Sequence, residues 1–233
     1  FMEDKEGIIW MGSKQDGLFR LERTGEDRFK IRQFTRQKDD PYSLSYNSIY
    51  TIFQDSKNRI WVGCYGGGLN LIEETQEGDI RFLHSGNKLT GYSKDRFAKV
   101  RYIAEANQVL LVGTTEGLLT FSSEFTQPEQ IEFYRNIRIP DKVSSLCSND
   151  VIYIYTDSRK DTYVLSFTGG LNKILSENLL SNEIEFKTYT TQNGLPSDLV
   201  ESMIEDNKGN LWIIAENALA CFHPDKETFE HYD

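Results

Sequence analysis

Acidic residues recur at the ends of several short apolar runs in this chain, and they are the side chains that most directly suggest chemistry. An acid closes a short apolar run at Asp4, Asp55, Asp157 and Asp206. A glycoside hydrolase needs two carboxylates about 5–10 Å apart, one of them with a raised pKa. Such a pair is needed only once, whereas a turn residue is needed in every repeat. Because an Asp side chain accepts hydrogen bonds from nearby backbone N–H groups, we predict that these acids cap turns.

Metal and cofactor chemistry has no clear support in the sequence. The histidines and cysteines are His84, His223, His231, Cys64, Cys147 and Cys221. Neither set has the spacing of a metal site or a disulfide framework, and the thiols on expected strands are predicted to be buried and unpaired. The glycines at 66–68 connect two strands rather than a strand and a helix, which favours a turn over a phosphate cradle. We predict no metal, no cofactor and no catalytic residue.

The elements that position these residues follow a repeat of about fifty residues. One leucine recurs with steps of 51, 49, 53 and 48, at Leu18, Leu69, Leu118, Leu171 and Leu219. Units of this length with four short strands are typical of propeller blades. We predict an all-β fold, a β-propeller with five four-stranded blades in one segment over residues 1–233. The blades are expected at roughly 1–34, 47–84, 97–134, 149–189 and 198–233.

The second copy illustrates how one blade is built. Its inner strand runs from Ile49 to Asp55, and its second strand covers 60–63. The tryptophan of that strand is expected to fill the flat face between blades, and its glycine to mark a close backbone approach. A Gly67-Gly68 pair then predicts a tight hairpin in which both residues have positive φ. The outer strand is expected to end near Phe82.

Composition narrows the function classes. The 233 residues carry a formal net charge of −10 and no basic block, which argues against a nucleic-acid partner. No apolar run approaches the ~18 residues of a membrane span, and no signal-peptide pattern opens the chain. The chain starts inside a repeat, since residues 1–4 match 52–55. We therefore expect a segment of a longer protein.

Two copies carry a resemblance to a known family. The stretch from Asp40 to Gly63 closely resembles the two-component regulator propeller repeat, and so do 193–200 and 205–212 in the fifth copy. The third copy departs from the pattern with Glu105 in place of the acid and a leucine in place of the tryptophan. The fourth departs more, with Tyr163 in place of the tryptophan.

This resemblance implies a function as well as a fold. In that family the repeats form the periplasmic sensor region of Bacteroides-type hybrid two-component histidine kinases. It implies that this segment is part of a larger, seven-bladed propeller. The full-length protein is expected to be anchored in the inner membrane, and whether it forms a dimer is left open. The implied partners are the neighbouring propeller and β-sandwich domains of the same receptor, together with an oligosaccharide ligand.

The connections between blades are the expected ligand site. In a propeller they share a face with the hairpins between the second and third strands. They are the longest irregular stretches, and loops on a rigid scaffold concentrate recognition residues. Sugar binding needs an aromatic plane and polar groups for hydroxyls. The connections cover roughly 35–47, 84–96, 135–149 and 190–198, and the candidate ligand-binding residues are Lys14, Gln15, Tyr46, Asn47, Tyr65, Arg96, Glu116, Asp198 and Glu216.

Three classes of function remain open. We favour a non-enzymatic, extracytoplasmic sensor segment that senses a glycan fragment or docks neighbouring sensor domains, and so controls a cytoplasmic histidine kinase and transcription. The alternatives are a propeller-type polysaccharide lyase or glycosidase, and a protein-interaction scaffold of the kelch or WD type. The Trp-Val-Gly sequence ahead of the glycine pair fits neither the kelch nor the WD signature well.

Overall fold

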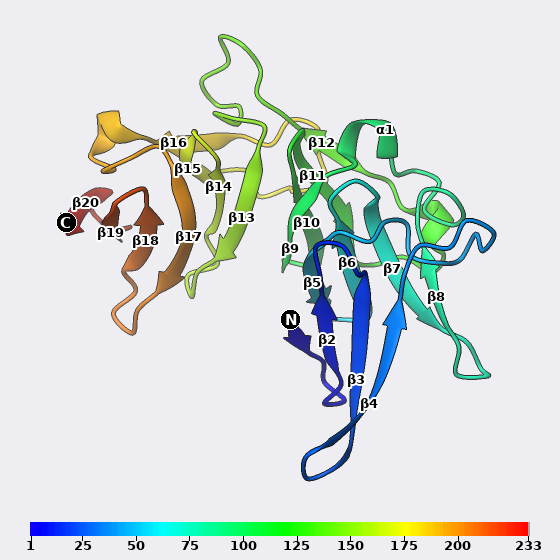
Figure 1. The fold of residues 1–233 in the computed structure, drawn as a ribbon. Helices are drawn as coiled ribbons and strands as arrows, with labels where there is room; N and C mark the ends of the chain where they lie inside the picture. The colour runs from blue at the N-terminus through cyan, green and yellow to red at the C-terminus, as the bar shows by residue number, and fades with distance from the viewer. Residues whose placement is uncertain (233) are drawn as a thin grey trace. The chain divides into compact units, whose positions relative to one another are not determined.

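The computed structural model describes residues 1–232, and β-strands dominate it (Figure 1). Twenty strands form five four-stranded sheets, and the strands of each sheet follow the order of the sequence. The first two sheets are β1 Met2–Glu3, β2 Ile9–Gly12, β3 Leu18–Gly25, β4 Arg28–Phe34 and β5 Ile49–Gln54, β6 Ile60–Cys64, β7 Gly68–Glu74, β8 Ile80–Leu83. The third is β9 Val100–Ala106, β10 Val109–Thr114, β11 Gly117–Ser122, β12 Tyr134–Asn136. The last two are β13 Val151–Thr156, β14 Thr162–Ser166, β15 Gly170–Ile174, β16 Phe186–Tyr189 and β17 Val200–Glu205, β18 Leu211–Ala215, β19 Ala218–His223, β20 Thr228–Tyr232. The predicted all-β fold with five four-stranded blades is confirmed.

Helical structure in residues 1–232 is confined to connections between strands. The segments are α1 Lys94–Phe97 and two 3₁₀ turns, η1 Pro128–Gln130 and η2 Thr191–Asn193. Among residues 1–232, none of these helices has the length and apolar composition that a bilayer crossing requires.

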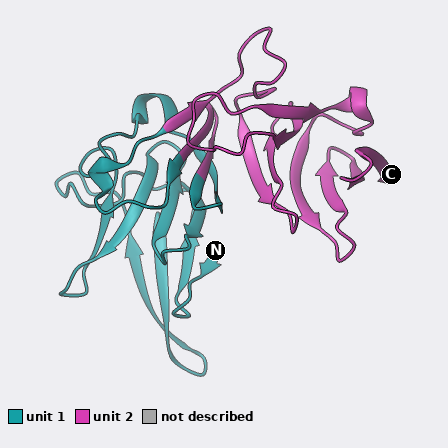
Figure 2. Cartoon of the chain, turned by 180° about the vertical axis from the view of Figure 1, so that it is seen from behind, with its two compact units in different colours: residues 1–110, 121–133 teal, residues 111–120, 134–233 magenta. Residues whose placement is uncertain are grey.

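The chain divides into two compact units, shown in teal and magenta in Figure 2. Unit 1 comprises Phe1–Leu110 and Phe121–Phe133, and unit 2 comprises Leu111–Thr120 and the chain from Tyr134 onward. The core of unit 1 includes Trp10, Ile49, Val62 and Phe82, from the first and second sheets and the loop between them. Unit 2 has a corresponding core between the fourth and fifth sheets, which includes Tyr163, Leu171, Tyr189, Met203 and Phe222.

The recurring acids cap the turns after the inner strands, as predicted. Asp55 Oδ1 accepts the backbone N–H groups of Lys57 and Arg59, both at 2.9 Å. Its Oδ2 accepts the indole N–H of Trp61 at 2.9 Å, a bond that the sequence analysis did not foresee. The first and fifth sheets repeat this indole bond, at 2.8 and 3.0 Å. The repeated acid therefore orders the turn and also fixes the tryptophan of the second strand.

The third sheet shows that Glu105 does not take the place of the recurring acid, so that prediction is wrong. The residue at the acid position is Ala106, and the turn after it is shorter: Asn107 and Gln108 both have positive φ, at 50° and 62°. A two-residue turn of this kind leaves no room for an Asp cap. Glu105 instead accepts the N–H and hydroxyl of Ser56 at 2.6 and 2.7 Å, which links the second and third blades.

Glycines on the second strands mark close contacts with the next blade, as predicted. A Cβ atom on Gly63 would lie 2.5 Å from both Thr51 and Val100. A Cβ atom on Gly113 would lie 2.7 Å from Val151. In each case the crowding atoms include those of the first residue in the next inner strand. Glycine at these positions lets the two sheets pack closely.

The hairpin between the second and third strands has the predicted two residues in the fifth blade, where Ala215 pairs with Ala218, but it differs from the expectation in the first two blades. Positive φ occurs at Gly68 (77°) but not at Gly67, and at Gly17 (78°) but not at Asp16. Cys64 pairs with Gly68, so three residues separate the strands and the two-residue turn that was predicted does not form. Gly66 (128°) and Gly68 both have the positive φ that glycine adopts without steric cost.

Candidate functional site

The nine candidate residues are distributed over both units. Lys14, Gln15, Tyr46, Asn47, Tyr65 and Arg96 belong to unit 1, whereas Glu116, Asp198 and Glu216 belong to unit 2. All lie in hairpins, in connecting loops or in α1. No single unit brings the nine side chains together.

Asn47 and Asp198 are held by contacts within their own loops. Asn47 Oδ1 accepts the N–H of Arg36 at 2.7 Å, and its carbonyl accepts the N–H of Gly17 at 3.0 Å. Asp198 Oδ1 repeats the first contact with the N–H of Thr191, also at 2.7 Å. These bonds close the connecting loop against the hairpin. The geometry assigns both residues a structural role.

Tyr65 lies in a group of aromatic and basic side chains. Its ring stacks on Tyr50 with a centroid distance of 4.5 Å, and Lys99 and Arg101 lie 5.4 and 5.5 Å from its centroid. Tyr46 is 41% exposed and packs against the hairpin at Gly66. Tyr46 is therefore the more accessible of these two candidate aromatic residues.

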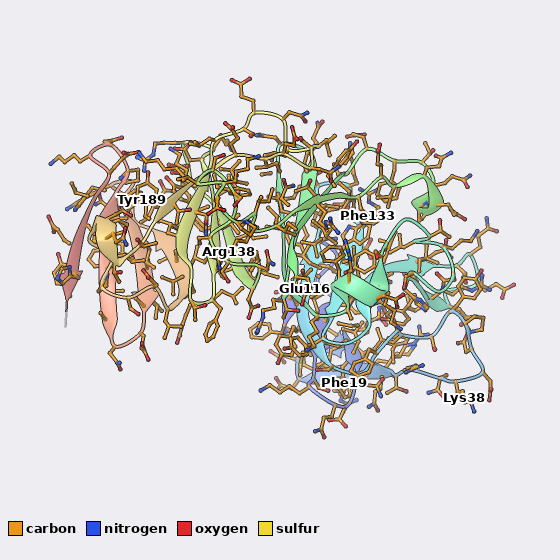
Figure 3. All side chains as sticks on the ribbon, turned by 90° about the horizontal axis from the view of Figure 1, so that it is seen from above. Phe19, Lys38, Glu116, Phe133, Arg138 and Tyr189 are labelled. Carbon is orange, nitrogen blue, oxygen red and sulfur yellow. The ribbon has the colours of Figure 1, made fainter. Side chains whose placement is uncertain are left out.

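A cleft of about 510 Å³ lies between two connecting loops of unit 1. We call it the loop cleft. Its lining comes from the β4–β5 and β8–β9 connections: residues 36–38, 40, 41, 43–45, 84–86 and 92–95. Both connections were predicted as ligand-binding loops, but none of the nine candidate residues is in this lining. Figure 3 labels Lys38, which lies on the first of these loops.

Hydrogen bonds to backbone carbonyls hold the first loop of the cleft against β8 and against the second loop. The N–H of Phe82 donates to the carbonyl of Tyr42 at 2.8 Å, and Asn87 Nδ2 donates to the carbonyl of Pro41 at 2.9 Å. Within the first loop, Ser43 Oγ accepts the N–H of Gln37 at 2.9 Å. The cleft is therefore formed without a ligand, as most small-molecule sites are.

A fully buried amide supports the floor of the cleft. Asn70 has no exposed surface, its Oδ1 accepts the N–H of Ser45 at 3.1 Å, and its Nδ2 donates to Ser45 Oγ at 2.8 Å. The same Nδ2 lies 3.3 Å from Cys64 Sγ. Burial raises the pKa of the Cys64 thiol to about 12, so this cysteine stays a neutral thiol. The floor is a closed polar network, which favours a rigid site.

His84 lies in the wall of the cleft. Its Nδ1 accepts the N–H of Gly86 at 3.1 Å. Burial lowers the pKa of His84 below its ordinary value of 6.5, and the positive charges of Lys94 and Arg36 lower it further. Backbone hydrogen bonds with Ser43 and Pro41 act in the opposite direction. His84 is consequently neutral at pH 7, and Arg36 and Lys94 line the same cleft.

The first loop of the cleft has a counterpart in unit 2, within the connection predicted at 135–149. The N–H of Arg138, labelled in Figure 3, donates to Asn149 Oδ1 at 2.7 Å, and the N–H of Ile139 donates to Ser145 Oγ at 3.0 Å. These are the same two contacts as in the first loop. The counterpart lines a smaller hollow of about 300 Å³. A buried leucine followed three residues later by Asn or Asp could have revealed the loop repeat: Leu44 and Asn47, Leu146 and Asn149, Leu195 and Asp198.

The described residues contain no candidate metal centre. Among residues 1–232, no group of three or more His, Cys, Asp or Glu side chains is arranged to hold a metal ion.

Comparison with known proteins identifies the repeat. The profile described as "Two component regulator propeller" matches residues 43–66 and 194–217. A 70-residue stretch is 33% identical to histidine kinase P4 of Formosa agariphila, which corresponds to 30% of this chain and 5% of that protein. The chain thus spans about a twentieth of the curated relative it matches.

Solved structures share the fold at low sequence identity. The extracellular domain of a putative hybrid two-component system from B. thetaiotaomicron is 18% identical with a TM-score of 0.68, over 100% of this chain and 30% of that one. Virginiamycin B lyase from Staphylococcus aureus is 15% identical with a TM-score of 0.61, over 99% of this chain and 68% of that one. Because both a signalling protein and an enzyme share it, the fold alone does not distinguish their functions.

Proposed function

Because the chain carries two-component regulator propeller repeats at 43–66 and 194–217, we propose that it is the extracytoplasmic sensor segment of a hybrid two-component signalling protein. The shared repeats and the likeness to an extracellular domain of such a system support this proposal. In this role the segment lies in the periplasm and acts on a cytoplasmic histidine kinase, and through it on transcription, without catalysing a reaction itself.

The loop cleft is the proposed ligand site, and its ligand is an oligosaccharide. The observation that carries this proposal is that part of a matched repeat lines the cleft: Ser43, Leu44 and Ser45 are in both. A hollow of about 510 Å³ falls in the range of small-molecule sites. The hydroxyls of Ser85 and Ser93 in the second loop supply further polar groups of the kind that sugar hydroxyls bind.

Binding in this cleft has a direct route to signalling. A ligand shifts a conformational equilibrium only if it binds one arrangement better than another. The two loops of the cleft connect successive blades, so a sugar that contacts both loops favours one spacing between them. Neighbouring propeller and β-sandwich domains of the same receptor would sense that spacing.

A thermal-shift screen of the 233-residue chain against a panel of oligosaccharides tests the proposal. A ligand at 100 times its dissociation constant stabilises the folded state by ~2.7 kcal/mol, which gives a measurable rise in Tm. Ser93→Trp should abolish that rise, because Ser93 lines the cleft and its side chain makes no capping bond in α1. The matched control is Thr90→Trp, an exposed position on the same loop outside the lining. No rise with any oligosaccharide, or an equal rise in Ser93→Trp, contradicts the proposal.

A further inference from the structure

We propose that the loop cleft takes an acidic oligosaccharide, with a uronate carboxylate or a sulfate group held between Arg36 and Lys94 beside His84. This inference rests on the proposed function and narrows its ligand to one chemical class. It starts from three cationic side chains in the cleft lining, those of Arg36, Lys38 and Lys94.

These three cations have no carboxylate partner within residues 1–232. None of their side chains takes part in any of the ion pairs, side-chain hydrogen bonds or cation–π contacts described for that part of the chain. Some basic side chains elsewhere in unit 1 have carboxylate partners, as Lys57 does with Glu124 and Lys88 with Glu129. The chain has more acids than bases, with 36 Asp and Glu against 26 Lys and Arg. Cations that gather unpaired around one hollow in such a chain leave charge available for a ligand.

The acids of the lining do not cancel this charge. They are Asp40 and Asp95. Asp40 Oδ1 accepts the N–H of Tyr42 at 2.9 Å, and its carbonyl accepts the hydroxyl of Ser43 at 2.8 Å, so it serves the turn of its own loop. With His84 neutral, three positive charges and two negative ones line the cleft. The lining is therefore positive overall in a chain whose formal net charge is −10.

The geometry favours an acidic sugar over a neutral one. Arg36 and Lys94 come from different loops, and both line the same cleft as His84. An anionic group bound in this cleft therefore faces a positive charge from each loop. The planar guanidinium matches carboxylate and sulfate oxygens with two parallel hydrogen bonds, and the ammonium adds a point charge. Such charge-assisted bonds are about twice as strong as neutral ones.

Isothermal titration of the 233-residue chain with three tetrasaccharides tests the inference: a tetragalacturonate, a chondroitin sulfate tetrasaccharide and cellotetraose as the neutral control. The double variant Arg36→Gln/Lys94→Gln removes the two charges and keeps hydrogen-bonding side chains. The matched control is Arg138→Gln/Lys142→Gln, which makes the same change in the smaller hollow of unit 2. Circular dichroism and Tm measurements establish that both variants are folded.

We expect one or both acidic sugars to bind, and Arg36→Gln/Lys94→Gln to weaken that binding at least about tenfold, which corresponds to ~1.4 kcal/mol. Binding should also weaken as salt rises, since exposed charges are screened. Whichever acidic sugar binds more tightly identifies the carboxylate or the sulfate as the preferred group.

Three results would overturn the inference. If cellotetraose binds as tightly as the acidic sugars and Ser93→Trp blocks it, the charge argument fails while the proposed sensor function stands. If acidic sugars bind but both double variants lose affinity equally, the attraction is a general charge effect and the assigned site is wrong. If no sugar binds in any of the three titrations, the inference fails and the proposed glycan ligand loses its support as well.

Discussion

The indole N–H of Trp61 donates to Oδ2 of Asp55 over 2.9 Å, which joins a turn to the face between two blades. The carboxylate is 1% exposed and also receives two backbone N–H groups of its turn. The indole ring in turn packs edge-on to Phe121 at 5.1 Å. A surface turn and the packing between blades thus depend on a single buried carboxylate.

Removal of that carboxylate should destabilise the fold strongly. Asp55→Ala leaves four donors without their acceptor: the N–H groups of Lys57 and Arg59, the Nε–H of Arg59 and the indole N–H of Trp61. Buried donors that lose a partner cost about 1–3 kcal/mol each. We expect a total loss of about 3 kcal/mol in the free energy of unfolding, because some of these donors reach water. Urea unfolding monitored by tryptophan fluorescence measures the loss. Asp79→Ala, at an exposed turn acid, is the control and should change stability by less than about 0.5 kcal/mol. Equal stabilities of the two variants would contradict the assigned role.

The hydroxyl of Tyr163 should contribute nothing to stability. Tyr163 replaces the recurring tryptophan in the fourth sheet, and its buried Oη has no hydrogen-bond partner among the described residues. Because an unsatisfied buried hydroxyl costs free energy, Tyr163→Phe should leave stability unchanged or raise it by about 1 kcal/mol. Tyr189 is the matched control, since its Oη donates to Glu227 at 2.8 Å. Tyr189→Phe should lower stability by about 1 kcal/mol. A Tm comparison in which Tyr163→Phe is the less stable of the two variants would refute this account.

Close packing between the second and third blades should make Gly63 intolerant of a side chain. A Cβ atom there meets Val100 and Thr51 at 2.5 Å, although the backbone at Gly63 does not have positive φ. We expect Gly63→Ala to cost about 1–3 kcal/mol from overpacking. Gly78→Ala separates packing from backbone effects: nothing lies within 4 Å of its Cβ position, but its φ is +82°. It should cost about 1 kcal/mol from strain alone. If Gly63→Ala has the same urea midpoint of unfolding as the wild type, the blades do not pack this closely.

Binding of an acidic sugar should strengthen as pH falls. Burial, Lys94 and Arg36 hold the pKa of His84 below 6.5 in the free protein, while the nearby acids of the lining are Asp40 and Asp95. A bound carboxylate or sulfate favours the protonated imidazole and raises that pKa. Binding then takes up a proton, so the affinity increases as pH falls through the pKa of the complex and then that of free His84.

An NMR titration of the His84 ring protons, with and without tetragalacturonate, measures this shift. We expect a higher pKa in the complex, and His84→Gln should bind with an affinity that is nearly flat between pH 7 and pH 5. An unchanged or lowered His84 pKa would place the anion elsewhere.

The sequence predicted the blades because their residues repeat for physical reasons that each blade shares. The turn at Asp55, the close approach at Gly63 and the flat face at Trp61 are needed in every blade, so comparison of the copies reveals them. In the third blade Glu105 was wrongly assigned to the acid position. The shorter turn of this blade has no acid at that position, and Glu105, one residue earlier, is the nearest carboxylate. The three-residue hairpin before Gly68 was missed because a glycine pair is compatible with more than one loop length.

The loop cleft was not predictable residue by residue for a different reason. Its two loops are joined through the carbonyl oxygens of Tyr42 and Pro41, and backbone acceptors leave no signature in residue type. Aromatic and polar residue types therefore pointed to exposed loop positions such as Tyr46. They did not point to Arg36 and Lys94, which matter through their position on the two loops of one hollow.

The most direct test of the loop cleft as the ligand site is an amide chemical-shift titration of the ¹⁵N-labelled chain with the tetrasaccharide that gives the largest rise in Tm. The account predicts that the largest shifts occur at Ser45, His84 and Ser93, with saturation at the same concentration for all three. If the largest shifts occur instead at Lys14, Gln15 and Tyr65 while the cleft amides are unchanged, the loop cleft is not the ligand site.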